Sequence, residues 1–198
     1  MDDRRVSPPD FITVVSGLPR SGTSLLMQML AAGGLEPLAD EHRGPDASNP
    51  RGYLEYEPVK ASARDTSWVP RARGRAVKVI HALLEHLPPD ERYKVILLQR
   101  PLEEVLASQA RMLEREGKRG AALPPGRLAA IFGAQLDKAR ALLERGAHFE
   151  WIELRYHDAL ADPTGFAERV AAFLELPLDT AAMAAQVDPT LYRERAGG

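Results

Sequence analysis

The stretch FITVVSGLPRSGTSLLMQMLAA, residues 11–32, decides how this chain folds. Its first six residues are mostly apolar and β-branched, which is typical of a buried strand. The next residues, GLPRSG, form a tight loop, and from Thr23 onward apolar residues recur at helical spacing. The order of strand, loop and helix places the loop at the carboxyl end of a strand, where α/β proteins bind their ligands.

The loop from Gly17 to Ser24 has the glycine spacing of a phosphate-binding loop. Small residues let successive backbone N–H groups turn toward an anion, and the N-terminus of the following helix adds the positive end of its dipole. Arg20 places a cation inside the loop. A nucleoside triphosphatase has a lysine directly after the second glycine, where this chain has Thr23. The loop therefore predicts an anion site unsuited to ordinary ATP or GTP hydrolysis.

Further strands and helices alternate along the rest of the chain. Three more runs of apolar residues predict strands, at residues 76–80, 93–98 and 148–154. Helical patterns cover residues 57–67, 102–116, 126–145, 163–174 and 179–185. Strands separated by helical crossovers predict an α/β fold of three layers, with a mostly parallel sheet flanked by helices. We expect a single domain over residues 1–198, with an irregular functional loop at 33–56.

A second pattern begins where the strand predicted at 93–98 ends. Arg100 stands at that strand end, and Ser108 follows eight positions later on the next predicted helix. The strand runs into Gln99 and Arg100 and not into an aspartate that would hold magnesium. We therefore expect arginine and backbone groups, without a metal, to neutralise the bound anion.

The two patterns together resemble a known family. PRSGTS, residues 19–24, resembles the 5′-phosphosulfate loop of sulfotransferases that use 3′-phosphoadenosine 5′-phosphosulfate (PAPS), and RPLEEVLAS, residues 100–108, resembles their 3′-phosphate motif. NPRGYLE at 49–55 and DPTLYR at 188–193 resemble parts of bacterial sulfotransferase-like proteins. The resemblance implies a P-loop NTPase-like fold of the sulfotransferase type. It also implies PAPS as donor and a metal-independent transfer of the sulfuryl group to an acceptor hydroxyl or amine.

The resemblance implies roles for the residues of both motifs. The N–H groups of residues 21–24 and the hydroxyls of Thr23 and Ser24 would hold the 5′-phosphosulfate, while Arg20 would neutralise charge on the bridging oxygen as it leaves. Residues of the second motif would bind the 3′-phosphate. The cofactor-binding candidates are thus Arg20, Ser21, Gly22, Thr23, Ser24, Arg100 and Ser108.

Lys78 joins Arg20 as a candidate for catalysis. A lysine inside the buried strand predicted at 76–80 needs a partner or a functional reason, and a sulfate contact would supply one. In the family a lysine and a histidine commonly follow one another near the end of this strand. Here His81 stands one position further from Lys78 than that pattern has it, which favours a structural histidine over a base.

The general base must come within about 2.6–3.2 Å of the acceptor proton, and the loop at 33–56 supplies the other candidates. They are Asp40, Glu41, His42 and Glu55. Resemblance to the tyrosyl-protein branch of the family favours Glu41, which belongs to an acidic pair at a similar distance from the phosphate loop. Glu55 is the second choice, since it precedes the helix predicted at 57–67.

Composition narrows the remaining possibilities. The chain has no cysteine, which excludes disulfides, thiolate zinc sites and cysteine nucleophiles. A net charge of -2 gives no overall field to recruit nucleic acid. The N-terminal MDDRRVSPPD lacks the apolar core of a signal peptide, and no run is long enough to span a bilayer, so we expect a cytoplasmic location.

Two other functions stay open beside a sulfotransferase. One is a nucleotide-binding module that keeps the PAPS site without catalysis. The other is a P-loop phosphotransferase, or kinase, although such an enzyme should have a lysine at position 23 and a magnesium ligand. The expected partners are a nucleotide cosubstrate and an acceptor that lies under the 33–56 loop.

Overall fold

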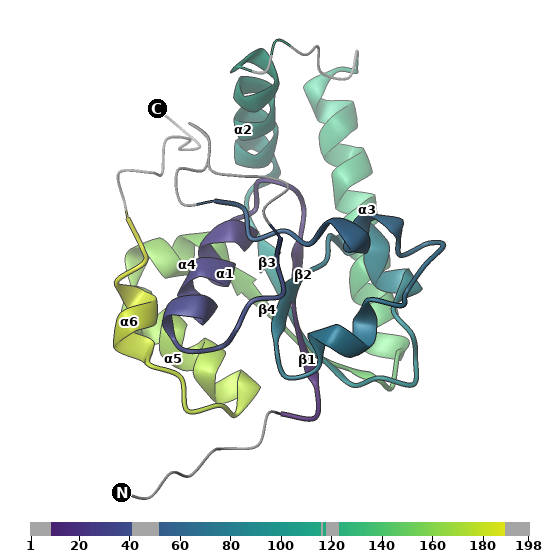
Figure 1. The fold of residues 1–198 in the computed structure, drawn as a ribbon. Coiled ribbons are helices and arrows are strands. Elements are labelled where there is room, and N and C mark those ends of the chain that lie inside the picture. The colour runs from purple at the N-terminus through teal and green to yellow at the C-terminus, as the bar shows by residue number, and fades with distance from the viewer. Residues whose placement is uncertain (1–8, 41–51, 116, 118–122, 189–198) are drawn as a thin grey trace, which may run out of the picture.

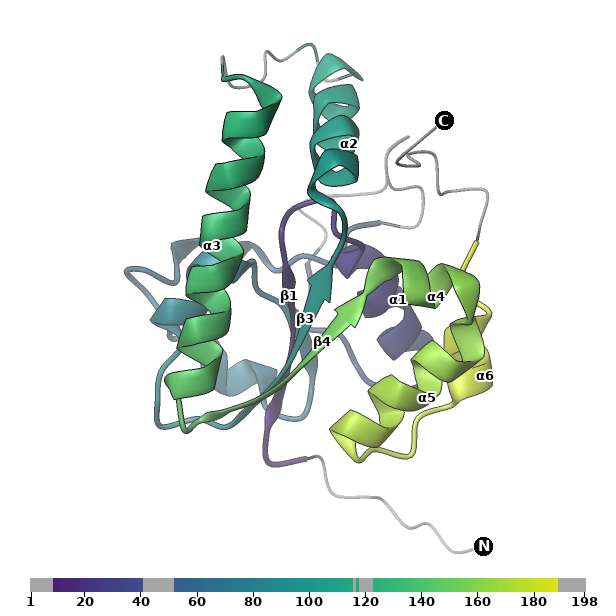
Figure 2. The same ribbon diagram turned by 180° about the vertical axis from the view of Figure 1, so that it is seen from behind.

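The computed structural model describes residues 9–40, 52–115, 117 and 123–188. At its centre is a four-stranded sheet in the order β2-β1-β3-β4, in which every pairing is parallel. The strands are β1 (Ile12–Gly17), β2 (Ala76–Lys78), β3 (Tyr93–Gln99) and β4 (Phe149–Arg155). Helices lie on both faces of the sheet (Figures 1 and 2), so the fold is the three-layer α/β arrangement that the sequence predicted.

Strand β1 lies inside the sheet, between β2 and β3, and all its residues are therefore buried. Its side chains alternate between the two faces. Ile12 and Val14 belong to the apolar core on one face, and Val15 belongs to the core on the other. In register, Gly17 at the end of β1 pairs with Leu98 of β3. The phosphate loop therefore begins at the carboxyl edge of the sheet.

One face of the sheet is covered by helices on the same side as the loop's own helix (Figure 1). They are α1 (Thr23–Ala32), α4 (Tyr156–Ala161), α5 (Pro163–Leu174) and α6 (Thr180–Ala184). Leu26 and Leu30 of α1 and Phe166 of α5 are almost completely buried in the core of this face. Burial of such side chains contributes roughly 1.5–3 kcal/mol each, which fixes α1 and the loop before it on the sheet.

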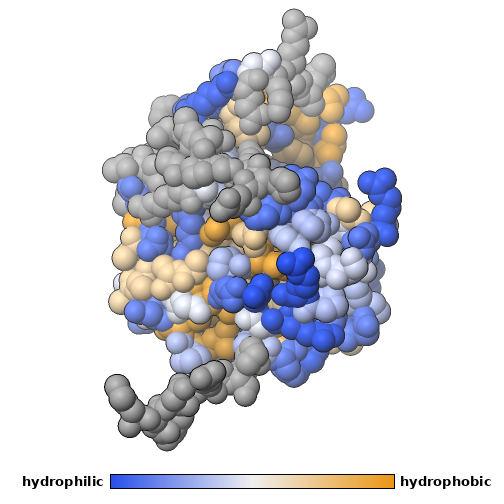
Figure 3. Space-filling model, in the orientation of Figure 1, coloured by the Kyte–Doolittle hydropathy of each residue, from blue (hydrophilic) through white to orange (hydrophobic). Residues whose placement is uncertain are grey.

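The other face carries the long helix α3 (Pro125–Arg145) and three short 3₁₀ helices: η1 (Glu57–Ala61), η2 (Val69–Ala72) and η3 (His81–His86). Apolar side chains of these segments, such as Val69 and Leu84, turn inward against β1 and β2. Hydrophilic side chains gather on the outer surface of this region, on the right in Figure 3. The short segments thus cover this face of the sheet and turn their apolar side chains toward it.

Helix α2 (Leu102–Arg115) and the N-terminal part of α3 stand beyond the carboxyl ends of the strands (Figure 2). Leu18 of the phosphate loop packs with Val105 of α2 and Leu136 of α3 in a small apolar cluster. This cluster attaches the loop to both helices. No helix in the described ranges combines the length and apolar character needed to cross a lipid bilayer.

The structure corrects some of the predicted elements. The helix expected at 57–67 is only the 3₁₀ helix η1, because Ser62 bonds back to the Val59 carbonyl and Asp65 accepts from the Ser67 N–H, which turns the chain away from a helix. The strand expected at 76–80 ends at Lys78. Helix α4 was not predicted. The described parts of 33–56 are irregular as expected, apart from a single bridge between Pro37 and Ala76.

Candidate anion-binding site

Two glycines of the loop cannot be replaced without conflict. Gly17 has φ +150°, and a Cβ there would lie 2.5 Å from Ser21 Oγ and 2.7 Å from the Leu98 carbonyl. Gly22 has φ +100°, and a Cβ there would lie 2.3 Å from a ring carbon of Tyr156. Both positions need glycine for conformation and for space, so the loop is tightly turned and packed.

Ser21 lies inside the turn. Its side chain is buried, and Oγ finds no hydrogen-bond partner among the residues that the structure describes. Its N–H bonds to the Leu18 carbonyl at 3.2 Å within the turn. Gly22 caps α1, so N–H groups of Gly22, Thr23 and Ser24 stand at a helix end that leaves them without intrahelical acceptors.

Arg20 has φ 71°, a left-handed conformation that costs a non-glycine residue about 1–2 kcal/mol. Two contacts hold it there. Its Nε donates to Ser108 Oγ of α2 at 3.0 Å, and its carbonyl accepts from an Arg100 Nη at 3.2 Å. The loop and the second sequence motif are therefore joined directly, and Arg20 and Ser108 face the same space.

Arg100 is buried and makes an ion pair within its own motif. Its Nε donates to Glu104 at 2.9 Å, and the Glu104 carboxylate also accepts a 3.0 Å contact from His157 of α4. The Glu104 side chain is only 2% exposed, which makes this a desolvated pair and not a surface one. The guanidinium carbon of Arg100 stands 4.9 Å from the centre of the Tyr156 ring.

Glu104, Tyr156 and His157 are site residues that the sequence analysis missed. Tyr156 packs on Gly22, and burial raises the pKa of its phenol, partly opposed by the positive charge of Arg100. Glu104 stands four residues after Arg100, in the first turn of α2, and this spacing is the one sequence signal that points to it. The contacts of Tyr156 with Gly22 and of His157 with Glu104 arise only through the fold.

Lys78 reaches the loop from the neighbouring strand. Its ammonium group donates to Ser24 Oγ at 2.9 Å and to the Tyr53 carbonyl, and it lies 3.8 Å from a Glu55 carboxylate oxygen. The Lys78 side chain is 6% exposed and the Glu55 side chain is 24% exposed. The structure thus brings together two residues of the predicted catalytic set beside the first turn of α1.

The other base candidates stand elsewhere. Asp40 accepts the Glu57 N–H at 2.6 Å, and its own N–H bonds to the Glu55 carbonyl at 2.9 Å, so it organises the segment around Glu55. Glu41 and His42 lie outside the described residues. His81 contacts the Gly17 carbonyl and Gln135 through its two ring nitrogens. Of the candidates that can be placed, Glu55 is the acid beside the loop.

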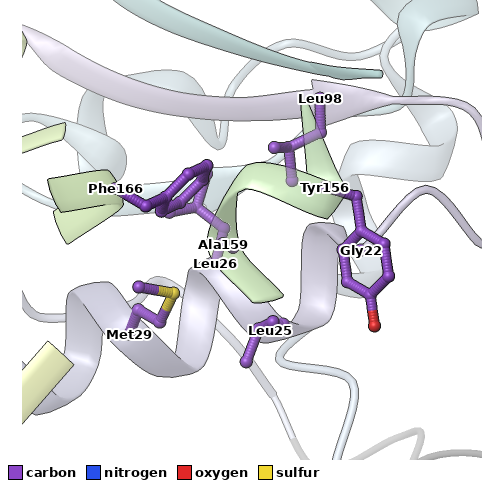
Figure 4. Close-up of a pocket in the computed structure, with 8 residues that line it drawn as sticks. All are labelled: Gly22, Leu25, Leu26, Met29, Leu98, Tyr156, Ala159 and Phe166. Carbon is purple, nitrogen blue, oxygen red and sulfur yellow. The ribbon is translucent and has the colours of Figure 1, made fainter. Parts of the chain in front are cut away.

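An apolar pocket lies behind the loop, between α1 and the helices that follow β4 (Figure 4). It is lined by Gly22, Leu25, Leu26, Met29, Leu98, Tyr156, Ala159 and Phe166. In Figure 4 the Tyr156 hydroxyl points away from it, so its walls offer no polar group to a ligand. In the described ranges no three His, Asp or Glu side chains gather where they would hold a metal ion.

No protein-family model matches this chain, and no curated protein does. Solved structures do. The sulfotransferase domain from the curacin biosynthetic pathway is 18% identical over 97% of this chain and 80% of its own, with a TM-score of 0.53. The sulfotransferase domain of the Synechococcus PCC 7002 olefin synthase is 18% identical over 95% and 84%, with a TM-score of 0.55.

Sulfotransferase STF1 from Mycobacterium tuberculosis H37Rv is 17% identical over 93% of this chain and 73% of its own, with a TM-score of 0.59. At such identities the likeness establishes the fold. The chain therefore has the α/β fold of sulfotransferases, which is the fold that the loop motif predicted.

Proposed function

We propose that this chain is a sulfotransferase that moves the sulfuryl group of PAPS to an acceptor hydroxyl or amine without a metal ion. The observation that carries the proposal is the placement of Lys78, which enters the phosphate loop from β2 and bonds to Ser24. The loop itself has Thr23 where a nucleoside triphosphatase has its lysine. Arg20 within the loop, Lys78 from β2 and Arg100 on the Arg20 carbonyl supply positive charge there, an arrangement suited to an anion that arrives without magnesium.

The loop also suits the 5′ end of this donor. The buried hydroxyl of Ser21 and the N–H groups at the start of α1 offer hydrogen-bond donors in the turn where an anionic group would sit. When bound, PAPS would supply an activated sulfuryl group on a nucleotide phosphate. Thr23 and Ser24 would add their hydroxyls, with Ser24 already oriented by Lys78.

Arg100 and Ser108 would hold the remaining phosphate charge of the nucleotide, next to Arg20. Arg20 and Ser108 stand within hydrogen-bond distance of one another, and Arg100 bonds to the Arg20 carbonyl, so one anion can contact more than one of these groups. An arginine fork suits planar, bidentate contact with a phosphate. Arg20 is the cation inside the loop itself, so we assign it to charge on the leaving oxygen and assign Arg100 and Ser108 to affinity.

Glu55 is our choice for the general base, and Lys78 stands beside it. Glu55 belongs to the segment that carries the Tyr53 carbonyl, and Lys78 fixes that segment against Ser24. A carboxylate at this place would accept the proton of an acceptor hydroxyl as the hydroxyl attacks, while the Lys78 ammonium would stabilise negative charge on the transferred group. Glu41, the other acidic choice, stays a prediction.

The proposal is tested by following the conversion of PAPS in the presence of EDTA with a panel of acceptors: a phenol, a primary alcohol, a glycan, an amine and a tyrosine peptide. Mass spectrometry would detect both adenosine 3′,5′-bisphosphate and the sulfated acceptor. The Arg20→Ala variant should lose turnover. The Arg92→Ala variant, which removes an exposed arginine paired with Asp10 outside the site, should keep it.

Each outcome separates the candidate functions. A sulfated product that forms without metal and needs Arg20 supports the proposal. Binding of the bisphosphate without turnover of any acceptor would favour a nucleotide-binding module. A magnesium-dependent transfer from ATP would favour a phosphotransferase and contradict the proposal.

A further inference from the structure

His81 connects three parts of the fold behind the phosphate loop. It opens η3, just after β2, and only 7% of its surface is exposed. Its Nδ1 lies 3.2 Å from the carbonyl oxygen of Gly17, the first loop residue, and its Nε2 lies 3.1 Å from the side-chain oxygen of Gln135 on α3. One imidazole therefore links the loop to the long helix on the far face of the sheet.

The partners of the ring decide what His81 can do. A backbone carbonyl only accepts hydrogen bonds, so Nδ1 carries a proton in its contact with Gly17. Nε2 meets the Gln135 amide, which can accept or donate according to which of its ends faces the ring. Both ring nitrogens are thus engaged by protein groups, whereas a general base needs an unprotonated nitrogen facing the acceptor proton.

The His81 contact falls on a residue whose conformation is tightly restricted, Gly17. Its φ of +150° and its close approach to Ser21 Oγ and the Leu98 carbonyl leave little room for another conformation. A donor on the Gly17 carbonyl fixes the peptide plane between Gly17 and Leu18. The direction of this plane determines how the chain enters the turn that holds Ser21 and Arg20.

We infer that His81 is a positioning residue: it holds the Gly17 carbonyl, and with it the phosphate loop, in the anion-binding conformation, and it ties that conformation to α3 through Gln135. The inference deepens the proposed function, on which its ligand-binding part rests. In this role His81 takes no proton from the acceptor, whereas a general base at the same strand end would.

Two isosteric variants separate the two contacts of the ring. In His81→Asn the side-chain amide nitrogen takes the place of Nδ1 and can still donate to Gly17, whereas the longer amide of His81→Gln reaches toward the place of Nε2. Calorimetric titration with adenosine 3′,5′-bisphosphate should show only a small loss of affinity in His81→Asn, which keeps the Gly17 contact and gives up the Gln135 contact. His81→Gln and His81→Ala should bind about tenfold more weakly, as expected for one lost buried hydrogen bond.

Amide hydrogen exchange across residues 17–24 of the free protein gives a readout that needs no ligand. Exchange should be faster in His81→Gln than in His81→Asn. If exchange is faster in His81→Gln than in His81→Asn but the wild type does not bind the bisphosphate, the proposed function fails and the positioning role stands. Equal exchange in the two variants would overturn the positioning role.

Two further results bear on the inference. Gln135→Ala alters an exposed residue of α3, which keeps the protein folded, and it should increase loop exchange by releasing Nε2; unchanged exchange would overturn the link to α3. A His81→Asn variant that binds the bisphosphate with nearly wild-type affinity, yet loses turnover together with the acidic limb of its pH profile, would show a base and overturn the inference.

Discussion

The ammonium group of Lys78 donates a 2.9 Å hydrogen bond to the hydroxyl of Ser24, from a neighbouring strand into the first turn of α1. Lys78 thereby adds to the loop a cation that the loop's own sequence does not contain. Because the lysine is almost completely buried and lies near the Glu55 carboxylate, its charge is little screened by water. This is the local electrostatic basis for the assignment of Lys78 to catalysis.

Replacing Lys78 with methionine keeps most of the side-chain volume and removes the charge. We expect the turnover number to fall by about 10²–10³, the usual effect of removing one preorganised donor from a transition state. The affinity for adenosine 3′,5′-bisphosphate should change much less. Turnover and calorimetric affinity, measured on the same preparation, check this prediction.

Lys94 provides the matched control, since it is also a buried lysine of the sheet but contacts α5 and not the phosphate loop. It donates to the Phe173 carbonyl near the end of α5 and lies 3.4 Å from carboxylate oxygens of Glu150 and Glu175. Lys94→Met should lower the thermal midpoint and leave bisphosphate affinity unchanged. A loss of turnover in the stable fraction equal to that of Lys78→Met would argue against a specific role for Lys78.

Gly22→Ala should disable the loop, whereas Gly34→Ala should only destabilise the protein. The two glycines have nearly the same φ, +100° and +98°, but a Cβ at Gly22 would overlap Tyr156 and one at Gly34 would meet nothing within 4 Å. Gly34→Ala should cost about 1–2 kcal/mol of unfolding free energy for its conformation alone. Gly22→Ala should cost about 1–3 kcal/mol more for overpacking and should weaken bisphosphate binding.

Denaturant unfolding and calorimetric titration of both variants provide the measurements. Equal destabilisation by the two substitutions would mean that Tyr156 is free to move off the loop. In that case the packing of Tyr156 on Gly22 would not support the loop's conformation.

The sequence predicted the parts of the fold whose signal is local. The β-branched run before Gly17 and the helical spacing after Thr23 gave β1, the loop and α1 with correct order and place. Helix α4 was missed because it has only six residues, Tyr156–Ala161, and follows β4 directly without a glycine or proline between them. So short a helix shows too few turns for helical spacing to be recognised in the sequence.

The site was predictable only where its residues lie in the motifs. The approach of Lys78 to Ser24 and the burial of Glu104 under Arg100 depend on how β2 and α2 pack, which no spacing in the chain reveals. Likewise, the contact between the Ser21 N–H and the Leu18 carbonyl is a property of the folded turn. Residue types at fixed offsets predict which groups are present, while tertiary packing decides which of them remain available to a ligand.

The buried pair of Arg100 and Glu104 should matter differently for stability and for binding. Arg100→Met removes this partner from the Glu104 carboxylate, whose side chain is only 2% exposed. The substitution should cost about 3 kcal/mol of unfolding free energy. The double variant Arg100→Met/Glu104→Met should regain most of that stability, because a buried pair replaced by apolar side chains is often neutral. Bisphosphate affinity should stay low in both, as measured by calorimetry.

Recovery of affinity in the double variant would contradict the assignment of Arg100 to the anion. It would mean that Arg100 influences binding only through the stability of α2. Unchanged stability in the single variant would instead show that His157 alone suffices for the Glu104 carboxylate.

His148 should make the fold sensitive to mild acid. Its ring packs at 4.0 Å from Phe149 between centroids, and burial lowers its pKa below the ordinary value of about 6.5. The unfolded chain then binds a proton at His148 more readily than the folded one. The stability that the neutral ring gives the fold is therefore fully present above about pH 6.5 and is lost as pH falls through the depressed pKa. Unfolding free energies between pH 7 and pH 5, in the range of imidazole titration, should fall less steeply for His148→Phe. An identical slope in the variant would contradict this role.

The proposed function requires that the loop bind a nucleotide bisphosphate without a metal. The most direct test is calorimetric titration of the protein with adenosine 3′,5′-bisphosphate and with ATP, each with and without magnesium. We expect tight binding of the bisphosphate that is independent of magnesium and stronger than the binding of ATP. A preference for ATP that requires magnesium would contradict it and would make the chain a phosphotransferase.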